Sequence, residues 1–600
     1  MNYLCKMRII SKSTSVESFF KTQPAKNAMN DWYNKIKFLF LVAFITTSSV
    51  HLDAVNAYPG IMTVRQPDGS EIRILMKGNA FNHVVYSTDG FPLVMNEDGY
   101  YVFSGLNREG EVFASDIKSI ETSSRTSSEK QWLSRVNVSG VVKALSEREN
   151  IKKKDKRQGP GLMSTYYPTL GEQKALVILV EFADKEFSMD DPKDFYTRML
   201  NEPGYAENGG TGSARDYFID NSSGEFIPSF DVYGPVKLKG EIAFYGQNDR
   251  WGDDTYPYLM VIEACRFLDN EIDFREYDRN GDGEIDNVFV YYAGYGENDG
   301  GGANTIWPHS SKMSLLSQEK TYLDGVLLER YACSNELHSP QRNGLPDGIG
   351  TFCHEFGHVL GLPDLYATTF INLETPGEWD VMDTGNYNNE GNTPANLSAF
   401  ERYALDWLKP KPFVNGDAIL EPIDIGNEAY IYQCKNPDEY FLFENRQQHG
   451  WDNFLPGHGM LVWQINYDPK IWAQNIVNNS FLQQYVDLIE ADGMGGLGSR
   501  DGDPFPGTSD KTAFSSQTSP AFRGKSETNI SVALSDITET EDGNISFVVT
   551  GSSETTGIGK NEITHNEKSD CLYDLTGRKI KRENPSPGIY IRNGKKVILR

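Results

Sequence analysis

The residues with the most evident chemistry run from His354 to Asp364 and read HEFGHVLGLPD. They contain the pattern H-E-x-x-H, whose two histidines are His354 and His358. On a helix this spacing puts both side chains on one face, so both imidazoles can point at one metal ion. The carboxylate of Glu355 can then reach a water molecule on that ion and act as its base. A catalytic zinc ion takes three protein ligands and keeps one position open.

The residues after His358 indicate where a third ligand comes from. Gly361 tolerates the left-handed conformation that ends many helices, and Pro363 keeps the chain extended after it. This bend can bring Asp364 back to the metal. Glu378 is the alternative, because it follows at about the spacing used by thermolysin-like enzymes. It lies in the sequence TPGE, which is typical of a turn rather than of a helix, so we favour Asp364.

A chance H-E-x-x-H on an ordinary helix is the competing interpretation, but the glycine and aspartate that follow at matching offsets argue against it. Met382 strengthens the case, because its surroundings, EWDVMDTG, resemble the methionine turn that lies under the zinc ion in metzincin proteases. Alone, a methionine in a turn is usually a packing residue. Some metzincins place a tyrosine two residues later to stabilise the tetrahedral oxyanion. Thr384 stands there, which leaves Tyr387 as the candidate for that role.

A second metal site is predicted in residues 278–286, DRNGDGEID. They follow the first nine positions of an EF-hand loop, with oxygen-bearing residues at alternating positions. The twelfth position holds Phe289 instead of the usual glutamate, so a complete EF-hand is not expected. An acidic surface turn is the alternative to a shorter structural calcium loop. The predicted calcium ligands are Asp278, Asn280, Asp282, the carbonyl group of Glu284, and Asp286.

Composition limits the classes of function. The chain has 600 residues, too many for a single core, and a formal net charge of −27. This charge argues against binding to nucleic acids or anionic membranes. The six cysteines are scattered along the sequence, so no disulfide framework is expected.

The N-terminal region, residues 1–57, has the order of a signal peptide. Lysines precede an apolar run at 38–45, and small residues lead to Ala57. The run is too short to span a membrane, although a membrane anchor is the alternative. Because the charged region begins far from residue 1, Met29 is a candidate for the true start.

Residues 58–160 are predicted to be a β-rich pro-segment, because apolar and polar residues alternate there between turns. Its end, with the basic run 152–157 next to QGPG, is typical of an exposed linker that can be cleaved or can simply join two domains. The pro-segment contains no cysteine. A thiolate therefore cannot block the zinc ion, and latency would need a carboxylate or steric cover.

The elements that position the metal ligands are predicted in residues 161–412. The apolar runs 175–182 and 287–293 indicate buried strands. Helices are expected over 213–220 and 254–268. Residues 413–550 are rich in strand formers separated by glycine and proline, which favours a β-sandwich-like module packed on the catalytic domain. The Ser/Thr/Glu-rich residues 551–570 are predicted to be a linker.

Together these features resemble the immune inhibitor A family of secreted bacterial metalloproteases. The resemblance covers roughly residues 58–550 and rests mainly on the zinc motif. It implies an endopeptidase with a metzincin-like catalytic domain, one zinc ion and structural calcium. The supporting segments are Val94–Tyr101, Ser213–Tyr217, Asp278–Asp286, Trp379–Gly385, Ser398–Arg402 and Leu455–Gly459.

Residues 571–600 resemble the C-terminal sorting domain of type IX secretion substrates, with YDLTGR followed by PGIYI and GKKVI. The resemblance implies passage to the outside or the cell surface by that machinery. An ordinary terminal β-hairpin is the alternative.

The sequence thus predicts an α+β multidomain protein with a β-rich pro-segment, a metzincin-like zinc protease domain, a β-sandwich-like module and a small C-terminal β domain. The expected function is hydrolysis of peptide bonds in extracellular proteins by a water molecule on zinc, with Glu355 as general base. The rival is a secreted, metal-stabilised binding module without proteolytic activity. No integral membrane span after signal removal is expected, and the sequence predicts no oligomeric state.

Overall fold

The computed structural model describes residues 57–146, 161–163 and 167–552, apart from gaps at 80–81, 97, 108–109, 111, 250–251, 339–343, 369–372, 481 and 497. It also describes the backbone of residues 53–54 and of short strands between 572 and 599. Most of the predicted signal region 1–57, the basic run 152–157 and most of the linker 551–570 lie outside the described residues. Within the described part, no helix has the length and apolar character to cross a membrane.

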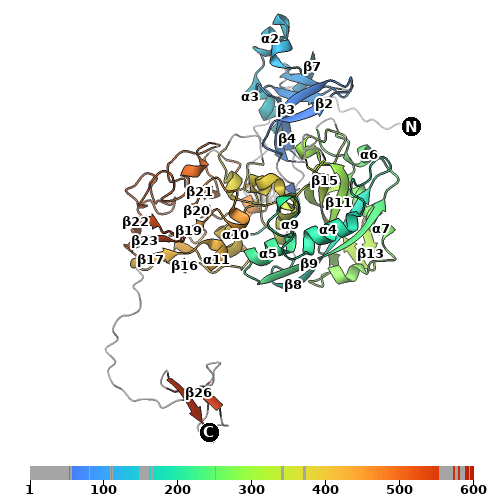
Figure 1. Ribbon diagram of the computed structural model, residues 1–600. Coiled ribbons are helices and arrows are strands. Elements are labelled where there is room, and N and C mark those ends of the chain that lie inside the picture. Colours follow the sequence, from blue (N-terminus) through green and yellow to red (C-terminus); the bar gives the residue numbers. More distant parts are fainter. Residues whose placement is uncertain are drawn as a thin grey trace, which may run out of the picture.

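A six-stranded sheet, whose edge strand β1 comes from residues 53–54, forms the centre of residues 161–412, which we call the central region (Figure 1). Its strand order is β1-β12-β15-β11-β8-β9, and the four strands β15, β11, β8 and β9 run parallel. Strand β12 pairs antiparallel with β15 near one edge. The predicted strands 175–182 and 287–293 correspond to β8 and β11. The bounds are β1 Asp53–Ala54, β8 Gly171–Glu181, β9 Phe226–Lys237, β11 Val288–Tyr295, β12 His309–Lys312 and β15 Arg330–Leu337.

Both faces of this sheet are buried. Successive side chains of a strand point to opposite sides, so one strand contributes to two cores. In β8, Val177 and Leu179 belong to one core, while Leu176 and Ile178 belong to the other. The first core is covered by α4 (Pro192–Asn201), α5 (Ala214–Asn221) and α9 (Gly350–Leu360). The second is covered by α6 (Ile242–Gly246), α7 (Pro257–Phe267) and a small sheet of β10 (Glu284–Ile285), β14 (Val326–Leu328) and β13 (Thr321–Leu323).

The predicted helix 254–268 begins later than expected, at Pro257. Asp254 instead forms an isolated β-bridge with Asn248. Proline is favoured at the first helical position because its missing N–H would have no partner there. The residues before it therefore form a loop rather than a helical turn.

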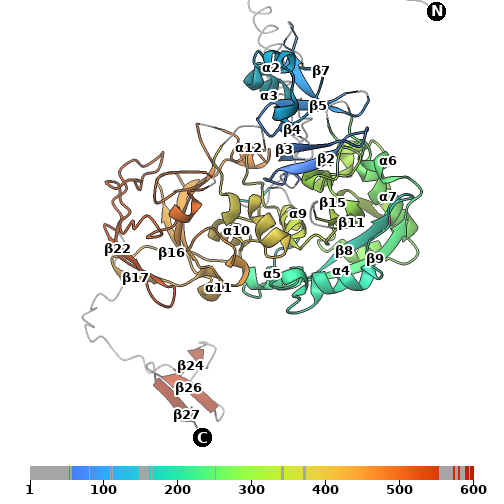
Figure 2. The same cartoon turned by 45° about the horizontal axis from the view of Figure 1, so that its top comes forward.

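The N-terminal region, residues 57–146, forms a separate antiparallel sheet whose six strands follow the chain order. Figure 2 shows its strands β2–β4 against the central region. Trp307 of the central region joins its core cluster beside Met62 and Ile74. The bounds are β2 Met62–Arg65, β3 Glu71–Asn79, β4 Asn82–Ser87, β5 Pro92–Met95, β6 Tyr101–Leu106, β7 Val112–Lys118, α2 Ser127–Leu133 and α3 Val138–Ser146.

Residues 411–552 form a β-rich module of two facing sheets. The five-stranded sheet uses one face, with Phe443 and Val462, to pack on the three-stranded sheet through Leu534 and Phe547. Its other face, with Trp463, joins the core of the central region. In sheet order, the strands are β16 Lys411–Pro412, β18 Tyr430–Gln433, β19 Glu439–Arg446, β20 Gly459–Asn466 and β21 Val486–Leu488, then β17 Gly416–Leu420, β23 Ile545–Thr550 and β22 Ala533–Glu539.

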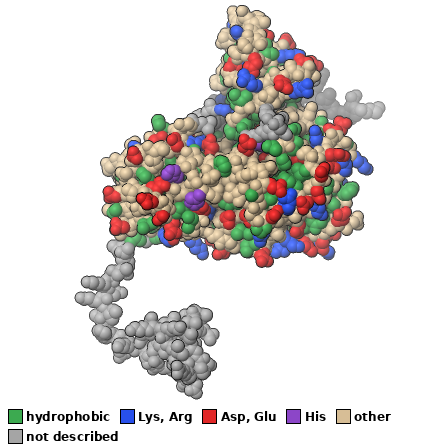
Figure 3. Space-filling view, in the orientation of Figure 1, with side chains coloured by type: hydrophobic (Ala, Val, Ile, Leu, Met, Phe, Trp, Pro, Cys, Tyr) green, Lys and Arg blue, Asp and Glu red, His purple; other side chains and the backbone are tan. Residues whose placement is uncertain are grey.

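The remaining elements are short. Acidic side chains are scattered over the face shown in Figure 3, in keeping with the net charge of −27. The backbone of residues 572–599 contains a four-stranded antiparallel sheet. The bounds are α8 Met313–Leu316, α10 Ala399–Ala404, α11 Ile423–Gly426, α12 Pro469–Trp472, β24 Leu572–Tyr573, β25 Lys579–Ile580, β26 Gly588–Arg592 and β27 Lys595–Leu599.

Candidate metal centre

The side chains of His354, His358 and Asp364 meet in the interior of the central region. Both histidines lie on α9, and each Nε2 atom is 3.2 Å from Oδ1 of Asp364. Their potential ligand atoms all lie within 4.8 Å of one another, and all three side chains are buried. Among the described residues, these form the one group of three or more His, Cys, Asp or Glu side chains that lie close enough to share a metal ion.

The hydrogen bond made by Nδ1 of each histidine determines whether Nε2 carries a hydrogen or a free lone pair. Nδ1 of His354 lies 2.8 Å from the carbonyl oxygen of Val381, and Nδ1 of His358 lies 2.8 Å from that of Leu362. A carbonyl oxygen only accepts, so each Nδ1 carries the hydrogen. In a neutral imidazole, Nε2 then presents a lone pair to Asp364. Two lone pairs and one carboxylate oxygen in a buried site suit a divalent cation that prefers nitrogen and oxygen ligands, such as zinc.

The turn after α9 places the third side chain. Gly361 has φ 101°, a left-handed conformation, and the N–H of Leu362 returns to the carbonyl oxygen of Gly357 at 2.9 Å. Asp364 is then held by Asn475, whose Oδ1 accepts from its backbone N–H at 2.7 Å and whose Nδ2 donates to its Oδ2. The second carboxylate oxygen is thus occupied, and Oδ1 faces the histidines.

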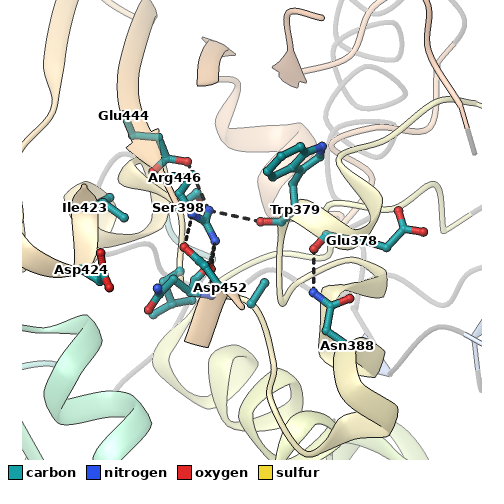
Figure 4. Close-up of polar contacts among 12 residues, drawn as sticks. Glu378, Trp379, Asn388, Ser398, Ile423, Asp424, Glu444, Arg446 and Asp452 are labelled. Carbon is teal, nitrogen blue, oxygen red and sulfur yellow. Dashed lines mark hydrogen bonds and ion pairs between the residues drawn. The ribbon is translucent and has the colours of Figure 1, made fainter. Parts of the chain in front are cut away.

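Glu378, the alternative third ligand, lies elsewhere. It belongs to a short 3-10 helix, Gly377–Trp379, and its Oε2 is 2.7 Å from Nε of Arg500. Its backbone carbonyl accepts from Nδ2 of Asn388 at 3.0 Å (Figure 4). The structure therefore brings Asp364, and not Glu378, next to the two histidines.

Glu355 and Met382 lie beside the three candidate ligands. Glu355 follows His354 on α9 and is fully buried. Met382 is also fully buried, directly against α9. A Cβ atom at Gly357 would lie 2.6 Å from the sulfur of Met382. The methionine therefore packs under the helical turn that carries both histidines.

Tyr387 is placed near the centre but has other contacts. Its hydroxyl oxygen lies 3.1 Å from Nδ2 of Asn298, which donates to it. Its ring makes an edge contact with Tyr58 of the N-terminal region, with centroids 5.6 Å apart. Burial raises the pKa of Tyr387 well above its ordinary value, so its hydroxyl stays protonated. It can donate a hydrogen bond, as an oxyanion stabiliser must.

The predicted calcium loop folds into a compact turn whose acidic side chains accept from its own backbone. Asp278 accepts from the N–H groups of Asp282 and Gly283, both at 3.0 Å. Asp282 accepts from Glu284 at 2.9 Å. Asp286 accepts from Nδ2 of Asn280 at 3.0 Å. These contacts all lie within the one loop. The described residues include no group of three carboxylates there that meets the distances of a shared ion.

Sequence reasoning missed a buried polar network that supports the methionine turn. Arg446 of β19 donates to Asp452 through Nε at 2.6 Å, and to the carbonyl oxygen of Trp379 through Nη1 at 3.3 Å (Figure 4). The side chains of Arg446, Glu444 and Asp452 are almost completely buried. The β-rich module thus holds the segment that leads to Met382. No local pattern marks Arg446, because its partner Trp379 is distant in the sequence.

The N-terminal region contacts the central region next to Tyr387. The backbone N–H of Tyr58 donates to the carbonyl oxygen of Asn298 at 3.0 Å. The Tyr58 ring contacts His338 and Tyr387. The rings of His83 and Trp307 lie 4.6 Å apart. These contacts cover the surface beside Tyr387, which is close enough to Glu355 for the carboxylate charge to contribute to the raised pKa of the tyrosine, after the larger effect of burial.

Comparisons with known proteins relate part of this chain to metalloproteases. Residues 164–412 match the family model described as immune inhibitor A peptidase M6, catalytic domain. Pre-pro-metalloprotease PrtV of Vibrio cholerae serotype O1 is 27% identical over 312 residues, which cover 44% of this chain and 33% of PrtV. Immune inhibitor A of Bacillus thuringiensis subsp. alesti is 28% identical over 279 residues, 40% of each chain. The chain thus spans about a third to two fifths of these curated relatives. The comparisons support a metalloendopeptidase.

Proposed function

We propose that this protein is a secreted zinc-dependent endopeptidase that hydrolyses peptide bonds of extracellular proteins. One observation carries the proposal. The side chains of His354, His358 and Asp364 converge within 4.8 Å, and the buried helix that carries the two histidines also carries Glu355. A purely structural zinc site tends to be closed by four protein ligands and has no use for a general base. Three ligands beside a buried glutamate suit a catalytic site better.

Each residue has one task in the proposed mechanism. His354, His358 and Asp364 would hold zinc, which when bound supplies Lewis acidity toward the scissile carbonyl group. The Glu355 carboxylate takes a proton from the attacking water and passes it to the leaving amine. Met382 fixes the helical turn under the two histidines. Tyr387, whose hydroxyl oxygen accepts from Nδ2 of Asn298, donates its own hydrogen to the oxygen of the scissile carbonyl.

The N-terminal region is proposed to keep the enzyme latent by steric cover. Tyr58 contacts both Tyr387 and His338, and its backbone is bonded to Asn298. Cleavage at the basic run 152–157 would separate this region from the central region and allow its release. The absence of cysteine in residues 58–160 excludes a thiolate switch.

Calcium binding and export complete the proposal. Asp278, Asn280, Asp282, Asp286 and the Glu284 carbonyl would bind a structural calcium ion that fixes the start of β11. Export would use the predicted signal peptide and then the type IX machinery, through residues 571–600. Protein or peptide substrates are the proposed partners.

Casein hydrolysis tests the proposal against the binding-module alternative. The full chain is assayed before and after limited proteolysis at the basic run, with and without a zinc chelator. Chelator-sensitive cleavage that returns when zinc is added back supports the endopeptidase. A zinc-loaded, correctly processed protein that cleaves neither casein nor a mixed peptide library would favour the binding module.

A further inference from the structure

A second group of buried oxygen atoms lies in the central region, outside the site described above. Oδ1 of Asn248, Oδ1 of Asp254 and Oε2 of Glu297 are buried and make no hydrogen bond. The side chains meet nevertheless, since Nδ2 of Asn248 donates to the other Glu297 oxygen at 2.6 Å. Oδ2 of Asp254 accepts from the backbone N–H of Trp307 at 2.9 Å. Buried polar atoms without partners are rare in folded proteins and call for a ligand or another explanation.

The carboxylates of Asp254 and Glu297, buried next to each other, need a positive counter-charge. Glu297 is 1% exposed. Burial and the neighbouring Glu297 raise the pKa of Asp254, and burial also raises the pKa of Glu297. No cationic side chain among the described residues forms an ion pair with either group. Leaving both charges unpaired in the interior would be costly.

A proton shared between the carboxyl groups of Asp254 and Glu297 does not explain their unpartnered oxygen atoms. A protonated carboxyl group would donate its hydrogen to an acceptor, yet Oδ1 of Asp254 and Oε2 of Glu297 have no partner within hydrogen-bond distance. A cation bound between them would satisfy both oxygens at once. Rotation of the Asn248 amide would add its Oδ1, because the two ends of an amide are exchangeable in such assignments.

We propose that Asn248, Asp254 and Glu297 form a binding site for one calcium ion. Carboxylate and amide oxygens are the ligands this hard cation prefers, and backbone carbonyl groups and water complete its shell in many proteins. The site is separate from the loop of residues 278–286. It adds a second calcium position, formed by residues that lie before and after β11 in the sequence.

The ion would join the loop that precedes α7 to the loop that leads to strand β12. The backbone N–H of Asn248 donates to the carbonyl oxygen of Ala303 at 3.0 Å, and that of Glu297 donates to Ile306 at 3.1 Å. Trp307, held by Asp254, contacts His83 of the N-terminal region and stands two residues before β12. Calcium at this point would therefore fix the surface on which the N-terminal region docks.

Calcium stoichiometry tests the proposal. The full chain carries Glu355→Ala throughout, to prevent self-digestion, and is compared with the same chain carrying Asp254→Asn and Glu297→Gln. Equilibrium dialysis with radioactive calcium should show one ion fewer in the second protein. Its melting temperature in EGTA should be no lower than that of the parent, because the carboxylate repulsion is gone. Its rise on adding calcium should be smaller. An unchanged ion count would overturn the proposal.

Two further variants keep the test sharp. Asp278→Asn with Asp282→Asn serves as the matched control, because it alters the other candidate loop and should leave the Asn248 site intact. Asn248→Asp adds a third carboxylate, so it should lower the melting temperature in EGTA and tighten calcium binding by roughly tenfold, about 1.4 kcal/mol. Weaker or unchanged calcium binding in Asn248→Asp would contradict the proposed site.

Discussion

A Cβ atom at Gly350 would lie 1.9 Å from the carbonyl oxygen of Asn386. The first residue of α9 therefore touches the backbone that follows the methionine turn, and only glycine fits there. The helix that carries both histidines and the segment that carries Met382 are thus held together by direct backbone contact. The geometry of the metal centre depends on this contact as well as on the ligands.

Gly350→Ala should disrupt the centre, because its neighbour is a backbone atom that cannot move without shifting the chain. We expect a loss of about 1–3 kcal/mol or more in unfolding free energy, the usual cost of overpacking. Gly357→Ala on the same helix is the matched control. Its Cβ atom would meet the sulfur of Met382, which can rotate away, so the loss should be smaller. Urea unfolding of both variants checks this order, and equal losses would contradict it.

Asp364→Ala should abolish tight zinc binding, whereas Glu378→Ala should retain it. Asp364 lies 3.2 Å from Nε2 of both histidines, while Glu378 pairs with Arg500. Zinc content after dialysis against a weak chelator distinguishes them. Retention of zinc in Asp364→Ala together with its loss in Glu378→Ala would show that the wrong ligand was assigned.

Arg446→Ala should strongly destabilise the protein, by about 3–5 kcal/mol, because it leaves Asp452 and Glu444 as unpaired buried charges. Arg275→Ala is the control, since Arg275 and Asp273 form an ion pair that is exposed to solvent. This control should leave the melting temperature unchanged. Thermal unfolding in the Glu355→Ala background measures both, and a small effect of Arg446→Ala would refute the proposed support of the methionine turn.

Asp487 should make stability fall with rising pH. It lines a small acidic pocket with Glu490 and Asp503. Burial, and then the charge of Glu490, raises the pKa of Asp487 from 3.8 to about 7. Between about pH 4 and about pH 7, the folded protein therefore keeps a proton on Asp487 that the unfolded chain has lost. The free energy of unfolding decreases as the pH rises through this range, and above it the buried charge of Asp487 destabilises the fold. Asp487→Asn should stabilise the protein by roughly 4 kcal/mol at pH 8 and little at pH 4. A pH-independent effect would contradict this.

The sequence predicted the parts of the site that depend on local spacing. His354, Glu355 and His358 share a helix turn, and Asp364 follows through a glycine bend, so a short pattern suffices to place them. Asn475 and Arg446 escaped detection because they reach the site from the β-rich module through contacts distant in the chain. Their sequence neighbourhoods look like ordinary turn and strand residues.

The central claim is that Glu355 acts as general base on a zinc site. Its most direct test compares casein hydrolysis and zinc content in the processed protein with those of Glu355→Ala. We predict one zinc ion in both proteins and a loss of at least about 100-fold in hydrolysis for the variant, the usual size of a general-base contribution. Full hydrolytic activity in a zinc-loaded Glu355→Ala protein would contradict the assignment.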